Sequence, residues 1–219
     1  MKFFTRSWFF RNKVHPLLSR IPLYDYWLLR RKSYLRDQGW FRSFKTGKSI
    51  NADGDPLPWI TYAAIDFLKE RLPADCVVFE YGAGYGTNWW AKHAKSVISV
   101  EHNEKWLSAL SDDIPENCQM IFRNLGEGYE EAVSEFDQKF DLIVIDGRNR
   151  VKCVYTSVDF LTDRGIIVFD DSNREKYREG IDFLLSAGFR QLRFTGFSPI
   201  EFLKCETSLF YKPGNLVGL

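Results

Sequence analysis

The chain has 219 residues, of which 45% are hydrophobic and 27% are charged. This length suits one α/β domain with an appendage of some tens of residues, and the composition excludes a disordered or fibrous protein. The net charge of +1 conceals an asymmetry, because residues 1–48 carry 12 Lys/Arg against 2 Asp/Glu, whereas residues 49–219 carry 18 against 27. The sequence therefore divides into a basic N-terminal part and an acidic remainder.

The cysteines and the apolar runs indicate a cytoplasmic protein. The four cysteines lie far apart with no CxxC pair, which predicts buried thiols rather than a zinc site or a disulfide framework. No run approaches the ~20 apolar residues of a membrane-spanning helix. Arg6, Arg11 and Lys13 interrupt the first apolar stretch, which disfavours a secretory signal.

Residues 1–58 are predicted to form a basic, aromatic-rich helical segment that ends in a loop. Pro16 and Pro22 divide it into short helices, and turn-forming residues fill the stretch 46–58. The 12 basic and 12 aromatic residues of 1–48 leave three interpretations open: an arm packed on the main domain, contact with a membrane surface or partner protein, and, least favoured, binding of nucleic acid. Peripheral membrane association therefore stays open, and no pattern indicates an oligomeric state.

Residues 59–219 are predicted to form the main domain, in which helices and strands alternate. Helices are expected over 59–72, 86–95, 104–110, 129–136, 151–161 and 175–187. Strands are expected over 76–81, 96–101, 119–122, 140–146, 165–170, 190–195 and 208–212. Several strands are apolar on both faces, as a parallel sheet between helix layers requires, and no clear helix separates the last two. This predicts a doubly wound, mostly parallel seven-stranded sheet with an antiparallel C-terminal edge.

A glycine-rich turn follows the first predicted strand and leads into a helix. Glycines allow such a tight turn and let a ligand approach the backbone closely. The sequence is Glu80-Tyr81-Gly82-Ala83-Gly84-Tyr85-Gly86, whose third glycine comes one residue earlier than in the GxGxxG of dinucleotide-binding enzymes. A nicotinamide-dependent oxidoreductase is therefore the disfavoured enzyme interpretation.

Polar residues also end the second and third predicted strands. Glu101 comes 19 residues after Gly82, where a carboxylate can accept hydrogen bonds from both hydroxyls of a ribose. His102 follows it directly and is expected to line the same pocket, and Asn124 follows the third strand.

The pattern E-x-G-x-G-x-G at residues 80–86 resembles the first motif of the class I S-adenosylmethionine-dependent methyltransferases, and the resemblance extends over about residues 59–212. It implies a Rossmann-like fold with S-adenosylmethionine as the cofactor. The residues then expected to bind the cofactor are Glu80, Tyr81, Gly82, Ala83, Gly84, Gly86, Glu101, His102, Asn124 and Asp146.

Three carboxylates, Asp146, Asp170 and Asp171, follow the fourth and fifth predicted strands and are the catalytic candidates. They resemble the metal site of the catechol and caffeoyl-coenzyme A O-methyltransferase branch, except that Asp171 stands where that branch has Asn. Three interpretations stay open: a bound Mg²⁺-like ion, a metal-free general base or substrate clamp, and turn formation alone. The metal ligands are therefore left unassigned.

Arg148, Arg150 and Arg174 flank these acids and are expected either to pair with them or to bind an anionic substrate. The favoured function is methyl transfer to an oxygen, or less readily a nitrogen, of a small-molecule or sugar acceptor. The loop 49–59 would help to shape the acceptor pocket. The alternative is a non-catalytic module of the same fold that docks to a membrane or partner through its N-terminal arm.

Overall fold

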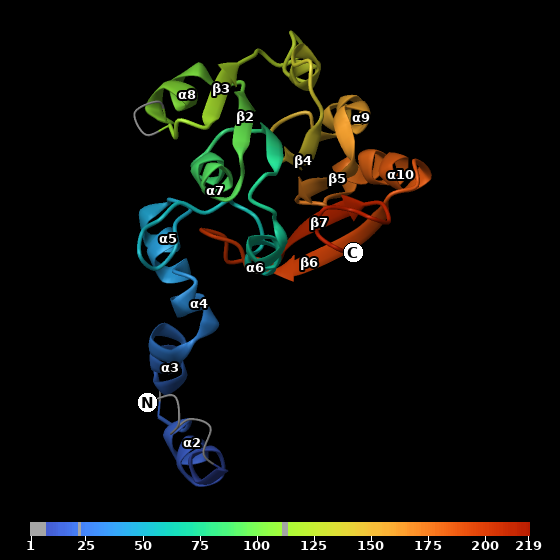
Figure 1. The fold of residues 1–219 in the computed structure, drawn as a ribbon. Helices are drawn as coiled ribbons and strands as arrows, with labels where there is room; N and C mark the ends of the chain where they lie inside the picture. Colours follow the sequence, from blue (N-terminus) through green and yellow to red (C-terminus); the bar gives the residue numbers. More distant parts are fainter. Residues whose placement is uncertain (1–7, 22, 111–113) are drawn as a thin grey trace.

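The computed structural model describes residues 8–21, 23–110 and 114–219 as an α/β domain with an N-terminal arm of short helices (Figure 1). Residues 1–7, which include Phe3 and Phe4 of the basic aromatic segment, lie outside the described residues. None of the helices in the described part of the chain is long and apolar enough to cross a bilayer.

Seven strands form one sheet in the order β3-β2-β1-β4-β5-β7-β6. Their bounds are β1 Val77–Tyr81, β2 Ser96–Glu101, β3 Cys118–Phe122, β4 Phe140–Ile145, β5 Leu161–Asp170, β6 Arg190–Gly196 and β7 Cys205–Tyr211. Strands β1 to β5 are parallel, whereas β7 is antiparallel to both β5 and β6. The predicted parallel sheet with an antiparallel C-terminal edge is therefore confirmed. The strand order reverses between β1 and β4, which opens a crevice at their carboxyl ends.

Helices cover both faces of the sheet. They are α6 Tyr62–Arg71, α7 Tyr85–His93, α8 Glu104–Leu110, α9 Arg150–Ser157 and α10 Arg178–Ser186, with 3₁₀ turns η3 Ala132–Glu135, η4 Val158–Phe160 and η5 Glu175–Tyr177. Alternate strand residues point to opposite faces, so Phe79 packs with α9 and α10, while Val78 packs with α6 and α7. The two apolar layers hold the sheet's carboxyl edge as a rigid platform.

The helix predicted over 129–136 is wrong apart from the short turn η3. Gly126 and Gly128 lie in the turns just before this stretch and adopt positive φ angles of 72° and 100°. The Glu130 carboxylate accepts hydrogen bonds from the Gly126 amide, at 2.9 Å, and from the Asn149 side chain. Tyr129 is fully buried. Tertiary contacts therefore replace the hydrogen bonds that a helix would have supplied.

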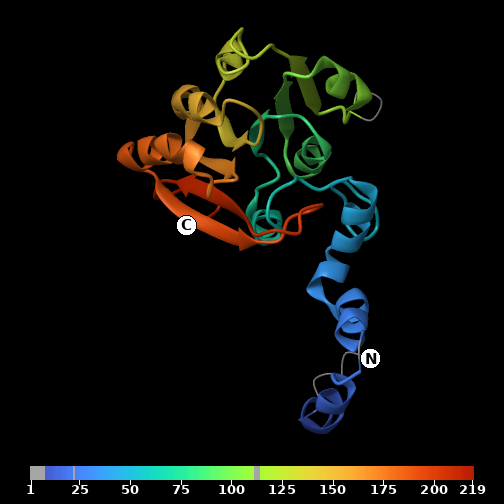
Figure 2. The ribbon, with the colours of Figure 1, turned by 180° about the vertical axis from the view of Figure 1, so that it is seen from behind.

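The N-terminal segment consists of short helices. Pro16 does not interrupt the chain's helical course, since it lies in the first turn of α2 directly after η1, and Pro22 lies outside the described residues. They are the π-helix η1 Phe10–Val14 and the α-helices α2 His15–Leu18, α3 Tyr24–Lys32, α4 Tyr34–Asp37 and α5 Trp40–Thr46. The later helices lie against the domain, where Leu35 and Trp40 pack on the core. The earlier ones, α2 and α3, project away from it in both views (Figures 1 and 2). The segment therefore has a packed root, formed by α4 and α5, and a protruding tip, formed by η1, α2 and α3.

Candidate active site

A cavity of about 590 Å³ opens at the carboxyl edge of the sheet. Its walls come from the loops after β1, β2, β4 and β5, together with the stretches 57–60 and 198–205. Such an edge is where doubly wound sheets bind their ligands, and the volume lies within the range of small-molecule sites.

The glycine loop between β1 and α7 forms one wall of the cavity. Gly82 has a φ of 100°, and a Cβ there would come within 2.8 Å of the Gly147 Cα in the loop after β4. Gly86 lies close to the backbone of Pro58, since a Cβ would approach the Pro58 Cα to 3.1 Å. At Gly84 a Cβ would meet nothing within 4 Å. Only Gly84 therefore presents bare backbone to open space.

The Glu80 side chain holds this loop in position through hydrogen bonds. Its buried carboxylate accepts hydrogen bonds from Thr87 Oγ1 at 2.6 Å, Ser99 Oγ at 2.7 Å and Trp90 Nε1 at 3.0 Å. The Thr87 hydroxyl in turn accepts the Gly84 amide at 3.0 Å. Burial raises the pKa of Glu80 to about 7 despite these three donors. The side chain ties β1, β2 and α7 together at the edge of the cavity.

Glu101 and its neighbours form a second wall of the cavity. The Glu101 side chain is buried and lines the cavity, and its Oε1 accepts the Asn103 amide at 2.7 Å. His102 Nδ1 lies 2.8 Å from the same oxygen. No hydrogen bond to Oε2 is found among the described residues, so this oxygen stays available to a ligand. Trp106, on α8, donates from Nε1 to the Ala83 carbonyl at 2.7 Å and so joins the two walls.

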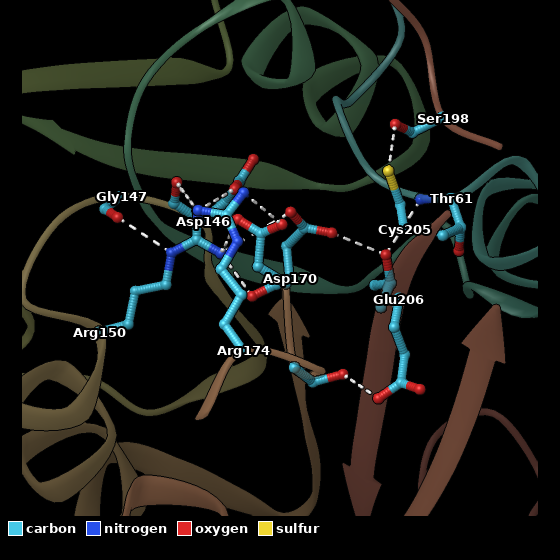
Figure 3. Close-up of polar contacts among 12 residues, drawn as sticks. Thr61, Asp146, Gly147, Arg150, Asp170, Arg174, Ser198, Cys205 and Glu206 are labelled. Atoms are coloured by element: carbon cyan, nitrogen blue, oxygen red, sulfur yellow. Dashed lines mark hydrogen bonds and ion pairs between the residues drawn. The ribbon is translucent and has the colours of Figure 1, made fainter. Parts of the chain in front are cut away.

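Three carboxylates surround one guanidinium at the ends of β4 and β5 (Figure 3). Arg150 lies 2.9 Å from Asp146 Oδ1, 3.3 Å from Asp171 Oδ2 and 3.7 Å from Asp170 Oδ2. It also donates to the Asp146 carbonyl at 3.1 Å and the Gly147 carbonyl at 3.0 Å. The buried guanidinium is therefore fully engaged as an internal counter-ion.

The Asp170 carboxylate has a second fixed partner. Its Oδ1 accepts a hydrogen bond from Thr207 Oγ1 at 2.7 Å, and Thr207 in turn accepts the Thr61 amide at 3.0 Å (Figure 3). Burial raises the pKa of Asp170 to about 6, and burial together with the Asp170 charge raises the pKa of Asp146. Asp170 can therefore exchange a proton at a pH near 6.

The donor set does not fit a divalent cation. Arg150 occupies the space between the carboxylates, and a second cation there would be repelled by its charge. No group of His, Cys, Asp or Glu in the described ranges is arranged to hold a metal. The Mg²⁺ interpretation is thus unsupported, because the chain supplies its own cation.

The three arginines near these acids differ in their surroundings. Arg150 and Arg174 pair with the carboxylates, the latter at 2.9 Å from Asp171 Oδ1. Arg148 also lines the cavity, and no ion pair to it is found within the described chain. Pairing therefore accounts for two of them, while Arg148 remains the candidate for an anionic substrate group.

The cavity brings together 13 of the 15 residues proposed from the sequence. These are Glu80, Gly82, Ala83, Gly84, Gly86, Glu101, His102, Asp146, Arg148, Arg150, Asp170, Asp171 and Arg174. The other two lie outside its lining: Tyr81 points into the core and donates to the Glu130 carbonyl at 2.9 Å, and Asn124 is exposed and donates to Glu127 at 3.2 Å. Strand alternation sends Tyr81 to the face away from Glu80.

Several lining residues escaped sequence reasoning. Trp106 reaches the glycine loop from α8, and Tyr177 stacks under Arg150, whose Cζ lies 5.2 Å from the ring centroid. Residue type and spacing do not indicate that these two side chains line a cavity. The position of Trp106, about one turn into the helix after the strand that ends at Glu101, is the one feature that could have suggested it. Trp59 and Ser49 belong to the loop expected to shape the acceptor pocket, and both line the cavity.

Comparison with known proteins points to one enzyme class. Residues 79–172 match the family model of a methyltransferase domain, a stretch that contains the glycine loop, Glu101 and the three carboxylates. No curated protein sequence matches the chain at a significant level.

Solved structures share the fold at low sequence identity. An rRNA methylase from Streptococcus thermophilus has a TM-score of 0.51 at 19% identity, covering 68% of this chain and 95% of its own. A precorrin-6y C5,15-methyltransferase from Geobacter metallireducens has a TM-score of 0.53 at 17% identity, covering 75% and 97%. A candidate methyltransferase from Streptococcus mutans, in complex with SAH, has a TM-score of 0.51 at 12% identity, covering 68% and 96%. Residues 79–172 therefore match a methyltransferase domain, and the chain shares the fold of these solved methyltransferases.

Proposed function

We propose that this enzyme transfers the methyl group of S-adenosylmethionine to an oxygen, or less readily a nitrogen, of a small-molecule or sugar acceptor. The observation that carries the proposal is that Gly84, Glu101, Asp146 and Asp170 line one cavity. A single site thereby holds a stretch of backbone without a side chain, a carboxylate that can accept hydrogen bonds from a ribose, and carboxylates that can accept a proton.

The glycine loop and Glu101 form the cofactor half of the cavity. Gly84 leaves room for the methionine part beside the backbone, and Glu101 Oε2 is free to accept a hydroxyl of the ribose. When bound, S-adenosylmethionine supplies a methyl group activated by a neighbouring sulfonium. The chain's part is to hold that group in line with the acceptor atom and to exclude water.

The carboxylates near β4 and β5 form the acceptor half. Asp170 is held by Thr207 and by Arg150, and its pKa of about 6 leaves it mostly ionised at neutral pH. In this position it accepts the proton of an acceptor hydroxyl as the methyl group arrives. Arg148 and Trp59 line the same cavity and would orient the acceptor.

Two measurements test the proposal. Calorimetry with S-adenosylhomocysteine and with NAD should give binding of the former alone. The full-length enzyme with S-adenosylmethionine is then assayed against sugars, phenols, amines and structured RNA, the last because one similar structure is an rRNA methylase. Turnover of a hydroxylated small molecule is expected. Methylation of RNA alone, or binding of NAD instead, would contradict the proposal.

A further inference from the structure

The N-terminal arm, which comprises the described residues from 8 to 33, exposes many large apolar side chains to solvent. None of the residues of η1, α2 and α3 is buried. Eight of its large apolar side chains are between 43% and 77% exposed: Trp8, Phe9, Leu17, Ile21, Leu23, Tyr26, Trp27 and Leu29. Such a density of exposed apolar groups marks a contact surface rather than ordinary surface scatter.

The side-chain hydrogen bonds found in the described part of the arm connect its own residues and do not reach the domain. Asn12 bonds to Trp8, Ser19 to Pro16 and Arg30 to Tyr26, each within one helical turn. Contacts that anchor the arm are found at its base, where Arg30 Cζ lies 4.9 Å from the Phe41 ring centroid. Further along, Tyr34 donates to Asp66 at 2.6 Å and Gln38 donates to Asp66 at 3.1 Å. The protruding tip is therefore free to meet something other than its own domain (Figure 2).

The net positive charge of the arm favours a negatively charged partner. Its basic residues are Arg11, Lys13, Arg20, Arg30, Arg31 and Lys32, against the single acid Asp25. A cavity of about 430 Å³ lies between its helices, with Phe10, Leu28 and Leu29 as apolar lining. Arg11 and Lys32 line it as cations, beside the polar groups His15, Asp25 and Ser33. An apolar surface joined to cationic groups matches an amphiphile with a negatively charged head.

We propose that this arm binds the surface of a bilayer that contains anionic phospholipids. Trp8, Phe9 and Leu17 enter the boundary between head groups and acyl chains, while Arg11 and Lys32 contact the phosphates. The arm lies on the membrane and does not cross it, because its helices are 4 to 9 residues long. The root ends at Gly47, which lines the active-site cavity, so the anchor holds that cavity near the lipid surface.

Single-stranded or structured RNA is the competing partner for a basic aromatic segment, and the side-chain chemistry disfavours it. Bases stack on flat aromatic rings, but Leu17, Ile21 and Leu23 are aliphatic and among the most exposed residues of the arm. Aliphatic groups gain free energy by leaving water for hydrocarbon. A lipid surface satisfies both the aliphatic and the cationic groups.

Vesicle sedimentation of the full-length protein tests this inference. Binding is expected to vesicles of phosphatidylcholine with about 30 mol% phosphatidylglycerol and not to phosphatidylcholine alone, and about 0.5 M salt should weaken it. Combined substitution Arg11→Glu, Lys13→Glu and Arg20→Glu should lower the partition coefficient at least about tenfold. Combined substitution Trp8→Ser, Phe9→Ser and Leu17→Ser should do the same.

Matched variants on the domain surface separate the arm from general effects. Lys69→Glu with Lys92→Glu changes exposed charges, and Leu125→Ser with Leu185→Ser changes exposed apolar groups, far from the arm in sequence. Neither pair should alter vesicle binding, and S-adenosylhomocysteine affinity should stay unchanged in all variants. Equal binding to neutral vesicles, insensitivity to the arm variants, or RNA binding through the arm without vesicle binding would overturn the inference.

Discussion

Gly82 and Gly84 stand two residues apart in the loop after β1, yet a side chain would meet different surroundings at each. At Gly82 it would collide with Gly147 and impose a positive φ on a residue that carries a Cβ. At Gly84 the backbone is extended, with a φ of −171°, and the space beyond it belongs to the cavity. The same loop thus contains one glycine required by folding and one for which we propose a role in ligand binding.

This difference predicts opposite outcomes for two substitutions. Gly84→Leu should lower the affinity for S-adenosylhomocysteine at least about 100-fold, because its side chain fills the space assigned to the cofactor, and should shift the melting temperature by only about 3 °C or less. Gly82→Ala should destabilise the protein by about 1–3 kcal/mol through backbone strain and the clash with Gly147. Calorimetry and urea unfolding measure the two effects. Undiminished binding by the Gly84 variant would count against the loop assignment.

The role of Asp170 as a proton acceptor can be tested by pH. Asp170→Asn keeps an oxygen that can accept from Thr207 but removes the base, so kcat should fall about 10²- to 10⁴-fold. In the wild type, kcat should fall as the pH is lowered through about 6, since the carboxylate becomes protonated. Asp171→Asn is the matched control, because Arg150 and Arg174 already engage that carboxylate. Equal losses in both variants with a flat pH profile would remove Asp170 from the mechanism.

At the scale of elements, strand ends were the most predictable features. The strand over 96–101 is found with unchanged bounds, because β-branched residues bounded by polar ones leave little choice of register. Parallel strands end at one edge, so the sequence could place Glu101, Asp146 and Asp170 near one another before any side chain was seen. The loop 126–131 was not predictable, because Glu130 is held by contacts from residues distant in sequence.

The role of Arg150 at the centre of the acidic cluster could not be predicted from the sequence either. Spacing showed that Arg150 lies near the carboxylates but could not tell pairing from substrate binding. The choice depends on the guanidinium reaching three backbone carbonyls and three acids at once. Such a set of contacts is a property of the packed edge and not of the local sequence. For the same reason Asn124, which follows a strand as expected, turns outward to Glu127.

Glu80 links three elements, and its ionisation should make the fold sensitive to pH. The folded-state pKa of about 7 lies above the ordinary value of 4.5, so the stability from the neutral carboxyl is fully present below pH 4.5 and is lost as the pH rises through 7. Glu80→Gln removes this titration. Between pH 5.5 and 8 the free energy of unfolding of the wild type should therefore fall by about 2 kcal/mol relative to the variant.

Urea unfolding of both proteins at the two pH values, without ligand, measures this difference. Gln cannot accept from Trp90, Thr87 and Ser99 in the same way, so a constant loss of stability at every pH is expected as well. The pH-dependent part is the diagnostic quantity. A constant gap between the two proteins across this range would mean that Glu80 does not titrate there.

At the scale of the whole molecule, charge and packing divide the chain at different places. The basic composition extends to residue 48, but the packing boundary lies near Ser33, whose hydroxyl caps α4 by accepting the Arg36 amide at 3.2 Å. Beyond it, Trp40 donates to the Glu201 carbonyl at 2.8 Å and Leu57 is buried in the core. We therefore propose that the folding unit begins at about residue 33 and not at 59.

Two truncations distinguish these boundaries. Removing residues 1–32 leaves in place the α4 cap and every side chain that is buried in the described part of the chain. The melting temperature should therefore change by about 2 °C or less and S-adenosylhomocysteine affinity by about twofold or less. Removing residues 1–58 exposes the core under Trp40 and Leu57 and deletes cavity wall, which should cost several kcal/mol and the ligand affinity. Thermal unfolding and calorimetry of the two truncated proteins give the comparison. If the longer truncation were as stable as the shorter one, residues 33–58 would be an accessory of the domain, and the cavity wall they contribute would be dispensable for its fold.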